Sequence, residues 1–251
     1  MRSSPISHPL SATGKLTHFR HISRSAQPIF TIETARFFRE LARNNHKPWM
    51  DANRERYKSC VVEPFRALLD RLAPFARKLN PRFETSGRVG KNFSRINRDV
   101  RFARDKSPYR PQMYLFFSEE AAHGAQVYVS LSAEAVTCGF RIYASASGKA
   151  SPLAQIARPR ALQNMKWIEH QQRRLAKEYQ SYWYSSVKGE WKKHRGWPVK
   201  PENWKRLQGW IVRRKLAPAA AARSTFHRDI AQIHRDVYPL YLFTTSSAWK
   251  P

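Results

Sequence analysis

The spacing at which apolar residues recur changes twice along this chain of 251 residues, and this change constrains the fold most strongly. Between residues 31 and 79 apolar residues recur every three or four positions, whereas in the stretches VYVSL and VTCGFRIYA they alternate with other residues. The first pattern is typical of amphipathic helices, and the second is typical of strands that bury one face. Helical spacing returns after residue 151. This order predicts an α+β fold with an N-terminal helical layer, a central antiparallel sheet and C-terminal helices.

The N-terminal layer is expected to contain three helices. The first is predicted to end at Asn44 and Asn45, because asparagine tolerates the left-handed conformation found at helix ends. Pro48 suits the first turn of the second helix, since the proline nitrogen needs no partner there. Pro64 is expected to start a third helix, which Pro74 ends or kinks.

Residues 111 to 144 are expected to form an antiparallel meander, because connections of hairpin length separate the alternating stretches. The segment RINRDVRFARDKSPY, residues 95 to 109, lies just before this meander. Its spacing fits a strand with Ile96, Val100 and Phe102 on one face, and it also fits a helix. We favour the strand, because a sheet follows and because valine and phenylalanine suit strands.

Two segments carry the helical spacing of the C-terminal part. They are residues 161 to 184 and residues 225 to 243, and we expect the second helix to run as far as Pro239. Residues 29 to 251 are therefore expected to form a single α+β domain. Residues 1 to 28 contain no acidic residue and show no apolar period, so they are expected to be a disordered basic extension. Their composition also resembles a transit peptide, which leaves organellar targeting as a minor alternative to a cytoplasmic location.

The excess of basic residues is the most pronounced compositional feature. The chain has 46 basic and 18 acidic residues, a formal net charge of +28, and the excess is spread along its length. Such a field attracts polyanions, of which nucleic acid is the commonest in a cell. No apolar run is long enough to span a membrane.

The sequence contains no motif that would hold a metal or a cofactor. Cys60 and Cys138 lie far apart without metal-ligand spacing, and we expect both to be buried thiols in a reducing compartment. There is no phosphate-binding loop, no nucleophile elbow and no HExxH pair. No cofactor is therefore evident, and the motifs do not decide whether the protein is an enzyme.

Two segments resemble a known family. RINRDVRFARDKSPY fits the pattern RxxRDxRFxxxKxPY, and FFRELARNNHKPWMDANRERY upstream fits a helix pair. On these residues the chain resembles a bacterial family described only as domain of unknown function 2461, over about residues 33 to 245. The likeness is weaker at His194 to Trp197, where the family usually has a Pro-Lys-Gly-Tyr type of turn. The resemblance implies one bacterial domain of about this length, and it implies no particular activity.

The charged residues of the segment 95 to 109, here called the motif, suit recognition of an anion. Arginine forks and lysine point charges bind phosphate and carboxylate groups well. Asp99 among these cations is expected to stay ionised, which makes it a poor general acid. If the upstream helix pair faces the motif, the two segments would build one polar pocket. The ligand-binding candidates are Arg95, Arg98, Asp99, Arg101, Lys106 and Tyr109 in the motif, and Asn44, Asn45, Trp49, Asn53, Arg54 and Tyr57 upstream.

A second candidate region alternates tryptophan with basic residues, as stacking platforms in a groove for nucleic acid do. Six or seven residues between tryptophans also fit turns that pack on a core. The nucleic-acid candidates are Trp191, Lys192, Lys193, Arg195, Trp197, Lys205 and Arg206.

Three interpretations of the motif and the charge stay open at this point. The first is a pocket for a phosphorylated or carboxylated small molecule, acting as a binding protein or an enzyme. The second is noncatalytic binding of nucleic acid or another polyanion through the distributed charge. The third is a purely structural network of salt bridges, in which the motif arginines pair with carboxylates such as Glu40 and Glu55.

Overall fold

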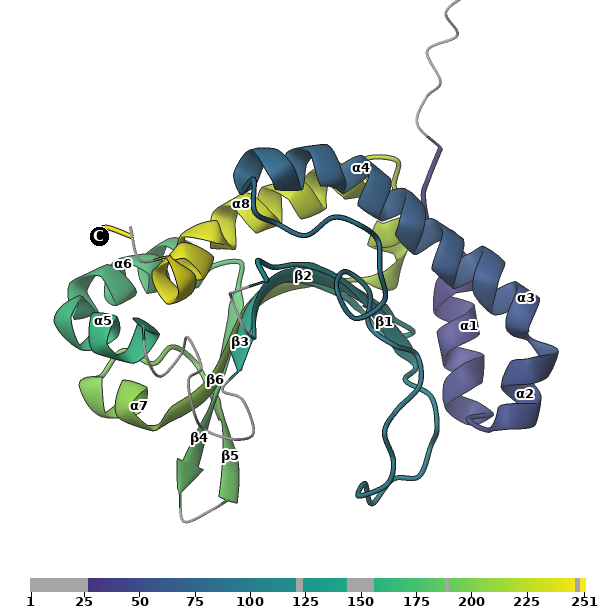
Figure 1. Ribbon diagram of the computed structural model, residues 1–251, viewed down its shortest axis with the longest axis horizontal. Coiled ribbons are helices and arrows are strands. Elements are labelled where there is room, and N and C mark those ends of the chain that lie inside the picture. Colours follow the sequence, from purple (N-terminus) through teal and green to yellow (C-terminus); the bar gives the residue numbers. More distant parts are fainter. Residues whose placement is uncertain (1–26, 121–123, 144–155, 188–189, 247–248) are drawn as a thin grey trace, which may run out of the picture.

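The protein is a mixed α+β structure with N-terminal helices, a six-stranded antiparallel sheet and a C-terminal helix (Figure 1). The fold class expected from the sequence is thus confirmed. This computed structural model describes residues 27–120, 124–143, 156–187, 190–246 and 249–251. The predicted basic extension, residues 1 to 28, lies almost entirely outside the described residues.

The N-terminal helices follow the predicted punctuation, with one difference. They are α1 (Ile32–Arg43), α2 (Lys47–Ala52), α3 (Arg54–Tyr57), the π-helical turn η1 (Lys58–Val62) and α4 (Glu63–Leu79). Asn44 caps the end of α1, and Pro48 lies in the first turn of α2, as expected. Of the two predicted effects of Pro74, ending or kinking the third helix, the first is wrong, because α4 continues through Pro74 to Leu79. Pro74 is exposed, so water can bond the carbonyl group that its missing N–H leaves unpaired.

The sheet contains twice as many strands as the meander that the sequence indicated. The strands are β1 (Gln112–Phe117), β2 (Ala125–Ser132), β3 (Val136–Tyr143), β4 (Gln180–Val187), β5 (Glu190–Arg195) and β6 (Leu207–Leu216). Their order is β1-β2-β3-β6-β4-β5, and every neighbouring pair is antiparallel. The last strand in the chain therefore lies between β3 and β4, and it joins the predicted meander to the C-terminal half.

The first helical segment predicted in the C-terminal part is too long, and the second is too short. They are α5 (Arg158–Gln163), α6 (Met165–Leu175), α7 (Pro201–Arg206), the 3-10 turn η3 (Pro218–Ala222) and α8 (Phe226–Thr245). A helix through residue 184 is wrong, because β4 begins at Gln180 and pairs with β6. Its aromatic residues fit either period locally, and the neighbouring strand decides for the sheet. The prediction that α8 stops at Pro239 is also wrong, since the helix continues to Thr245.

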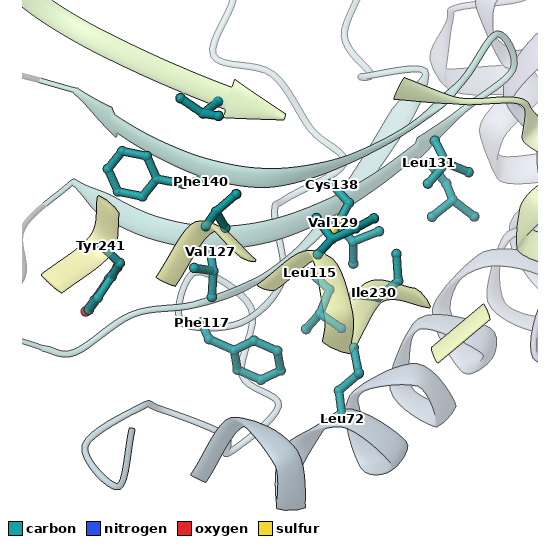
Figure 2. Close-up of a cluster of buried hydrophobic side chains, with 14 of the residues drawn as sticks. Leu72, Leu115, Phe117, Val127, Val129, Leu131, Cys138, Phe140, Ile230 and Tyr241 are labelled. Atoms are coloured by element: carbon teal, nitrogen blue, oxygen red, sulfur yellow. The ribbon is translucent and has the colours of Figure 1, made fainter. Parts of the chain in front are cut away.

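The core lies between one face of the curved sheet and the two longest helices. Helices α4 and α8 run side by side over the outer side of the arch, and α8 contacts β2 and β3 (Figure 1). Alternate strand residues such as Val127, Val129 and Phe140 point toward this layer, where they meet Ile230 and Leu72 (Figure 2). The predicted alternation of β2 and β3 is confirmed by this burial.

The other face of the sheet lies on the inner side of the arch, away from α4 and α8 (Figure 1). Its buried side chains form a separate small cluster of Phe116, Tyr128 and Ile211, all from the sheet itself. We call this surface the open face. It is formed by the alternate strand residues Tyr114, Phe116, Tyr128, Arg141, Tyr182, Tyr184, Ile211, Arg213 and Lys215. The loop that precedes β1 and the β4–β5 hairpin both extend on this side (Figure 1).

Candidate anion-binding site

The motif is a loop that runs out from the edge of the sheet and returns, so the predicted strand is wrong. Its two arms are joined by hydrogen bonds from Arg98 N to Pro108 O (2.8 Å) and from Arg110 N to Ile96 O (2.8 Å). The tip carries Phe102, which is 96% exposed instead of buried. The alternation of apolar residues misled the prediction, because Ile96 at the base of the loop packs on the core whereas Phe102 at the tip has no layer to pack on.

The tip of the loop is organised by ion pairs between close neighbours in the sequence. Arg101 binds Asp99 with both ends of its fork, at 3.0 Å from Nε to Oδ1 and 2.7 Å from Nη2 to Oδ2. Arg98 pairs with Asp105. Lys106 donates from Nζ to the carbonyl oxygens of Val100 (3.1 Å) and Arg101 (3.3 Å). The hydrogen bond from Arg101 lowers the pKa of Asp99, so the expectation of an ionised Asp99 is confirmed.

The structural interpretation expected ion pairs between the motif and the helical layer. The ion pairs of Arg98 and Arg101 instead stay within the motif. Glu40 pairs instead with Arg56 and Arg36 within the N-terminal helices. The motif and the helical layer are joined by Asn45, which donates from Nδ2 to Tyr109 O and accepts from Tyr109 N, both at 2.9 Å. The linking group is therefore an amide and not a carboxylate.

The other upstream candidates are occupied within their own helices. Asn44 donates to Glu40 O (2.9 Å) and Asn53 donates to Trp49 O (3.0 Å), so both amides cap helix ends. Arg54 pairs with Asp51 at 2.7 Å, and the ring of Trp49 packs on Phe37 with centroids 5.5 Å apart. Among these upstream candidates, Asn45 bonds to the motif, Tyr57 lines a hollow that motif residues also line, and Arg54 interacts electrostatically with Tyr109.

Two adjoining hollows lie at the base of the loop, and they share Phe93, Ser94, Arg95 and Asn97. One hollow has a volume of about 310 Å3 and reaches the helical layer, where Tyr57, Val62 and Arg66 line it. The other has a volume of about 460 Å3 and reaches the open face, where Arg98, Asp99, Arg110 and Phe116 line it. We call the two hollows together the motif cleft. The cleft thus gathers residues from α3, η1, α4, the motif and β1.

Three guanidinium groups of the cleft have no counter-ion in the part of the chain that the structure describes. Within the described residues, the side chains of Arg66, Arg95 and Arg110 make no ion pair, whereas Arg98 does. The nearby carboxylates are engaged by Arg101 and by Arg98. Burial raises the pKa of Tyr57 to about 12, so its phenol stays protonated and can donate a hydrogen bond.

The structure divides the predicted motif residues into two groups. Arg95, Arg98 and Asp99 line the cleft, whereas Arg101 and Lys106 brace the loop tip. Tyr109 is 7% exposed and takes part through its backbone. Four polar residues of the cleft were not among the candidates from the sequence, namely Arg66, Ser94, Asn97 and Arg110. Arg110 directly follows the motif, and its place beside Arg98 could have been found only from the return of the loop.

Two rings of the tryptophan-rich segment, those of Trp197 and Trp204, pack on the core. Trp204 is fully buried, and Trp197 packs on the buried Trp210 with ring centroids 5.4 Å apart, so the core interpretation applies to these rings. Arg195, Lys205 and Arg206 are exposed. Trp191, Lys192 and Lys193 lie on β5, and their side chains are outside the described residues.

Comparison with known families decides the relationship that the motif suggested. The model of a family described as conserved hypothetical protein (DUF2461) matches residues 33–243, from α1 to α8. The chain belongs to the DUF2461 family. The matched region of this DUF2461 protein contains the whole motif cleft. No curated protein matches the chain.

The described part of the DUF2461 protein also bears on metal binding, on membrane spanning and on its two thiols. Within it, no group of three or more His, Cys, Asp or Glu side chains is placed to hold a metal ion. None of the described helices combines the length and the apolar character needed to cross a bilayer. Cys138 is buried, as expected, but Cys60 is only half-buried, and burial raises the pKa of both thiols.

Proposed function

We propose that this protein binds a small phosphorylated or carboxylated compound in the motif cleft. The observation that carries the proposal is the presence of unpaired guanidinium groups, Arg95 and Arg110, in one hollow together with Arg98. Cations held close together repel one another, and an anion between them relieves this repulsion and accepts several charge-assisted hydrogen bonds. The motif thereby combines a structural part at its tip with a binding part at its base.

The neutral groups of the cleft suit the same ligand. Ser94 offers a hydroxyl group and Asn97 offers an amide, and Phe93 adds an apolar wall. Hollows of about 310 Å3 and 460 Å3 are in the range of small-molecule sites. The wall toward the helices contains the π-helical turn η1, a type of turn that recurs at functional sites.

The proposal concerns binding and includes no catalytic step. Asp99 has a lowered pKa and is held by Arg101, so it would be a poor general acid. Tyr57 has a raised pKa and would be a poor general base near neutral pH. The cleft therefore offers charge and hydrogen bonds without an evident proton-transfer group.

Titration calorimetry with inorganic pyrophosphate and with citrate tests this proposal, one probe for each class of anion. We expect Arg95→Gln and Arg110→Gln each to weaken the binding of the preferred probe about tenfold, since one charge-assisted contact contributes about 1.5 kcal/mol or more. Thermal stability should change little, because neither side chain makes an ion pair within the described residues. Arg104→Gln is the matched control, because Arg104 is an exposed arginine of the same loop that does not line the cleft. The proposal is refuted if neither pyrophosphate nor citrate binds. It is also refuted if Arg104→Gln weakens binding as much as the two cleft variants do.

A further inference from the structure

The open face of the sheet is a second surface with unusual chemistry, distinct from the motif cleft. Two cross-strand rows define it. In the first, Phe116 of β1 pairs with Tyr128, Tyr128 with Gly139, and Gly139 with Arg213. The second row contains Gln126, Arg141, Ile211 and Tyr182. Because paired residues of antiparallel strands point to the same side, the aromatic rings and guanidinium groups of these rows share one face across five strands.

The charges of this face have one sign. Its named residues include Arg141, Arg213 and Lys215 and no aspartate or glutamate. Arg141 and Arg213 are diagonal neighbours on β3 and β6, and both interact electrostatically with Tyr128. Arg214, the next residue along β6, points to the opposite side and pairs with Glu178 at 3.1 Å. Within the described residues, Arg141 and Arg213 of the open face thus lack the carboxylate partner that Arg214 has.

The partners of these two arginines are neutral. Arg141 donates from Nε to Gln126 Oε1 (2.8 Å), and its guanidinium carbon lies 4.6 Å from the ring centroid of Tyr114 and 4.9 Å from that of Tyr128. Arg213 lies 4.9 Å from the ring centroid of Tyr182. The Nε of Arg213 is buried without a hydrogen-bond partner within the described residues. Each guanidinium is therefore oriented by rings while its charge stays uncompensated.

Two glycines lie between these side chains, at positions where a Cβ atom would clash with its neighbours. A Cβ atom on Gly139 would lie 2.1 Å from the Val212 carbonyl oxygen, and one on Gly209 would lie 2.8 Å from the ring of Tyr143. Both positions lie on the open face, in neighbouring strands. Larger residues at these points would separate the strands or displace the ring, so glycine at these positions lets β3 and β6 pair closely and lets the Tyr143 ring lie against the sheet.

We infer that the open face binds single-stranded nucleic acid. The phosphates of the nucleic acid would lie between Arg141, Arg213 and Lys215. Its bases would stack on the tyrosine rings at the margin of the face. Basic side chains interleaved with aromatic rings on a sheet provide two contributions to the free energy of such binding. These are electrostatic attraction of the phosphates and stacking of the bases. A flat anionic bilayer fits the concave side of the arch poorly (Figure 1), and a duplex hides the base faces that the rings would stack on. This inference does not depend on the small-anion site.

Fluorescence anisotropy of the full chain with a labelled 12-nucleotide oligothymidylate tests the inference. We expect affinity to fall steeply between about 50 and 200 mM salt, with Arg213→Gln weakening binding about tenfold and Tyr182→Leu somewhat less. Lys215→Gln is a variant that should leave folding intact, because Lys215 is exposed at the end of β6. It should lower the affinity and reduce the salt slope by about one. Arg213→Lys should recover part of the loss by restoring the charge.

The matched control is Arg228→Gln, which removes an exposed arginine from α8 on the other side of the sheet. Its affinity should stay within about twofold of the parent protein, because distant exposed charges are screened at such salt. An equal loss in Arg228→Gln would show attraction by net charge only. Equally tight binding of a duplex of the same length, or binding of polyglutamate in place of the oligonucleotide, would also overturn the inference. Loss of pyrophosphate or citrate binding alone would bear on the motif cleft and not on this surface.

Discussion

At the scale of single residues, Asn45 joins the two segments that the family motif brings together. Its side-chain amide pairs with both the N–H and the C=O of Tyr109, as a neighbouring strand would. The ring of Tyr109 is buried, so water cannot easily replace these two hydrogen bonds. One amide therefore fixes the end of the loop against the turn between α1 and α2.

We predict that Asn45→Ala lowers the free energy of unfolding by about 1–3 kcal/mol, because it leaves partly buried backbone groups unsatisfied. Urea denaturation followed by circular dichroism measures the change. Asn53→Ala is the comparison, since its amide makes one hydrogen bond, to Trp49 O, and caps a helix locally. If Asn53→Ala costs as much as Asn45→Ala, the link between motif and helical layer contributes nothing beyond a cap.

At the scale of elements, the end of α8 is held by a side chain from α5. The last carbonyl groups of a helix have no partner within it. Arg160 donates from Nη1 to Phe243 O (2.5 Å) and from Nη2 to Ser246 O (2.8 Å). Its guanidinium also lies 5.0 Å from the ring centroid of Trp249. A short helix thereby stabilises the terminus of the longest one.

We predict that Arg160→Gln lowers the free energy of unfolding by about 2–3 kcal/mol, because it removes charge-assisted bonds to helix carbonyls. Hydrogen exchange of the last turn of α8 should accelerate more than that of its first turns. Arg173→Gln on α6 removes an exposed arginine and should change stability by less than about 0.5 kcal/mol. Uniform exchange along α8 in Arg160→Gln would contradict a local capping role.

At the scale of the whole molecule, His234 makes stability depend on pH. This residue of α8 is fully buried against Phe117, and its ring nitrogens have no hydrogen-bond partner within the described residues. Burial lowers the pKa of His234 from its ordinary value of 6.5 to about 4. Between these values the unfolded chain binds a proton that the folded protein excludes. The contribution to stability is complete above pH 6.5 and is lost as the pH falls toward 4.

We predict that acidification from pH 7 to pH 5 costs about 2 kcal/mol through His234, since each unit of pKa difference corresponds to about 1.4 kcal/mol. His234→Leu places an apolar side chain that cannot titrate at the site, and it should remove this part of the pH dependence. The measurement is urea denaturation of both proteins at several pH values from 4 to 7.5. Parallel stability curves for the two proteins would show that His234 does not titrate in this range.

The fold could be predicted where a single period dominates a long segment. In α4 the apolar residues that set the helical period are buried, and in β2 and β3 the alternation matches the face that α8 covers. In β4 the aromatic residues Tyr182 and Trp183 fit a helix or a strand, and pairing with β6 decides between them. The motif was misplaced for a related reason, because its apolar residues alternate although Phe102 has nothing to pack on.

The amino-acid sequence by itself determined the class of fold, the family, the high positive charge and the segment in which to seek a site. Only the tertiary structure decided which arginines have internal partners. Arg101 pairs with Asp99, whereas Arg95 and Arg110 line one hollow at the base of a returning loop. The tertiary structure also decided that Arg141 and Arg213 adjoin, since β6 inserts beside β3 from far along the chain. Such convergence depends on strand order and loop closure, and no local period records either of them.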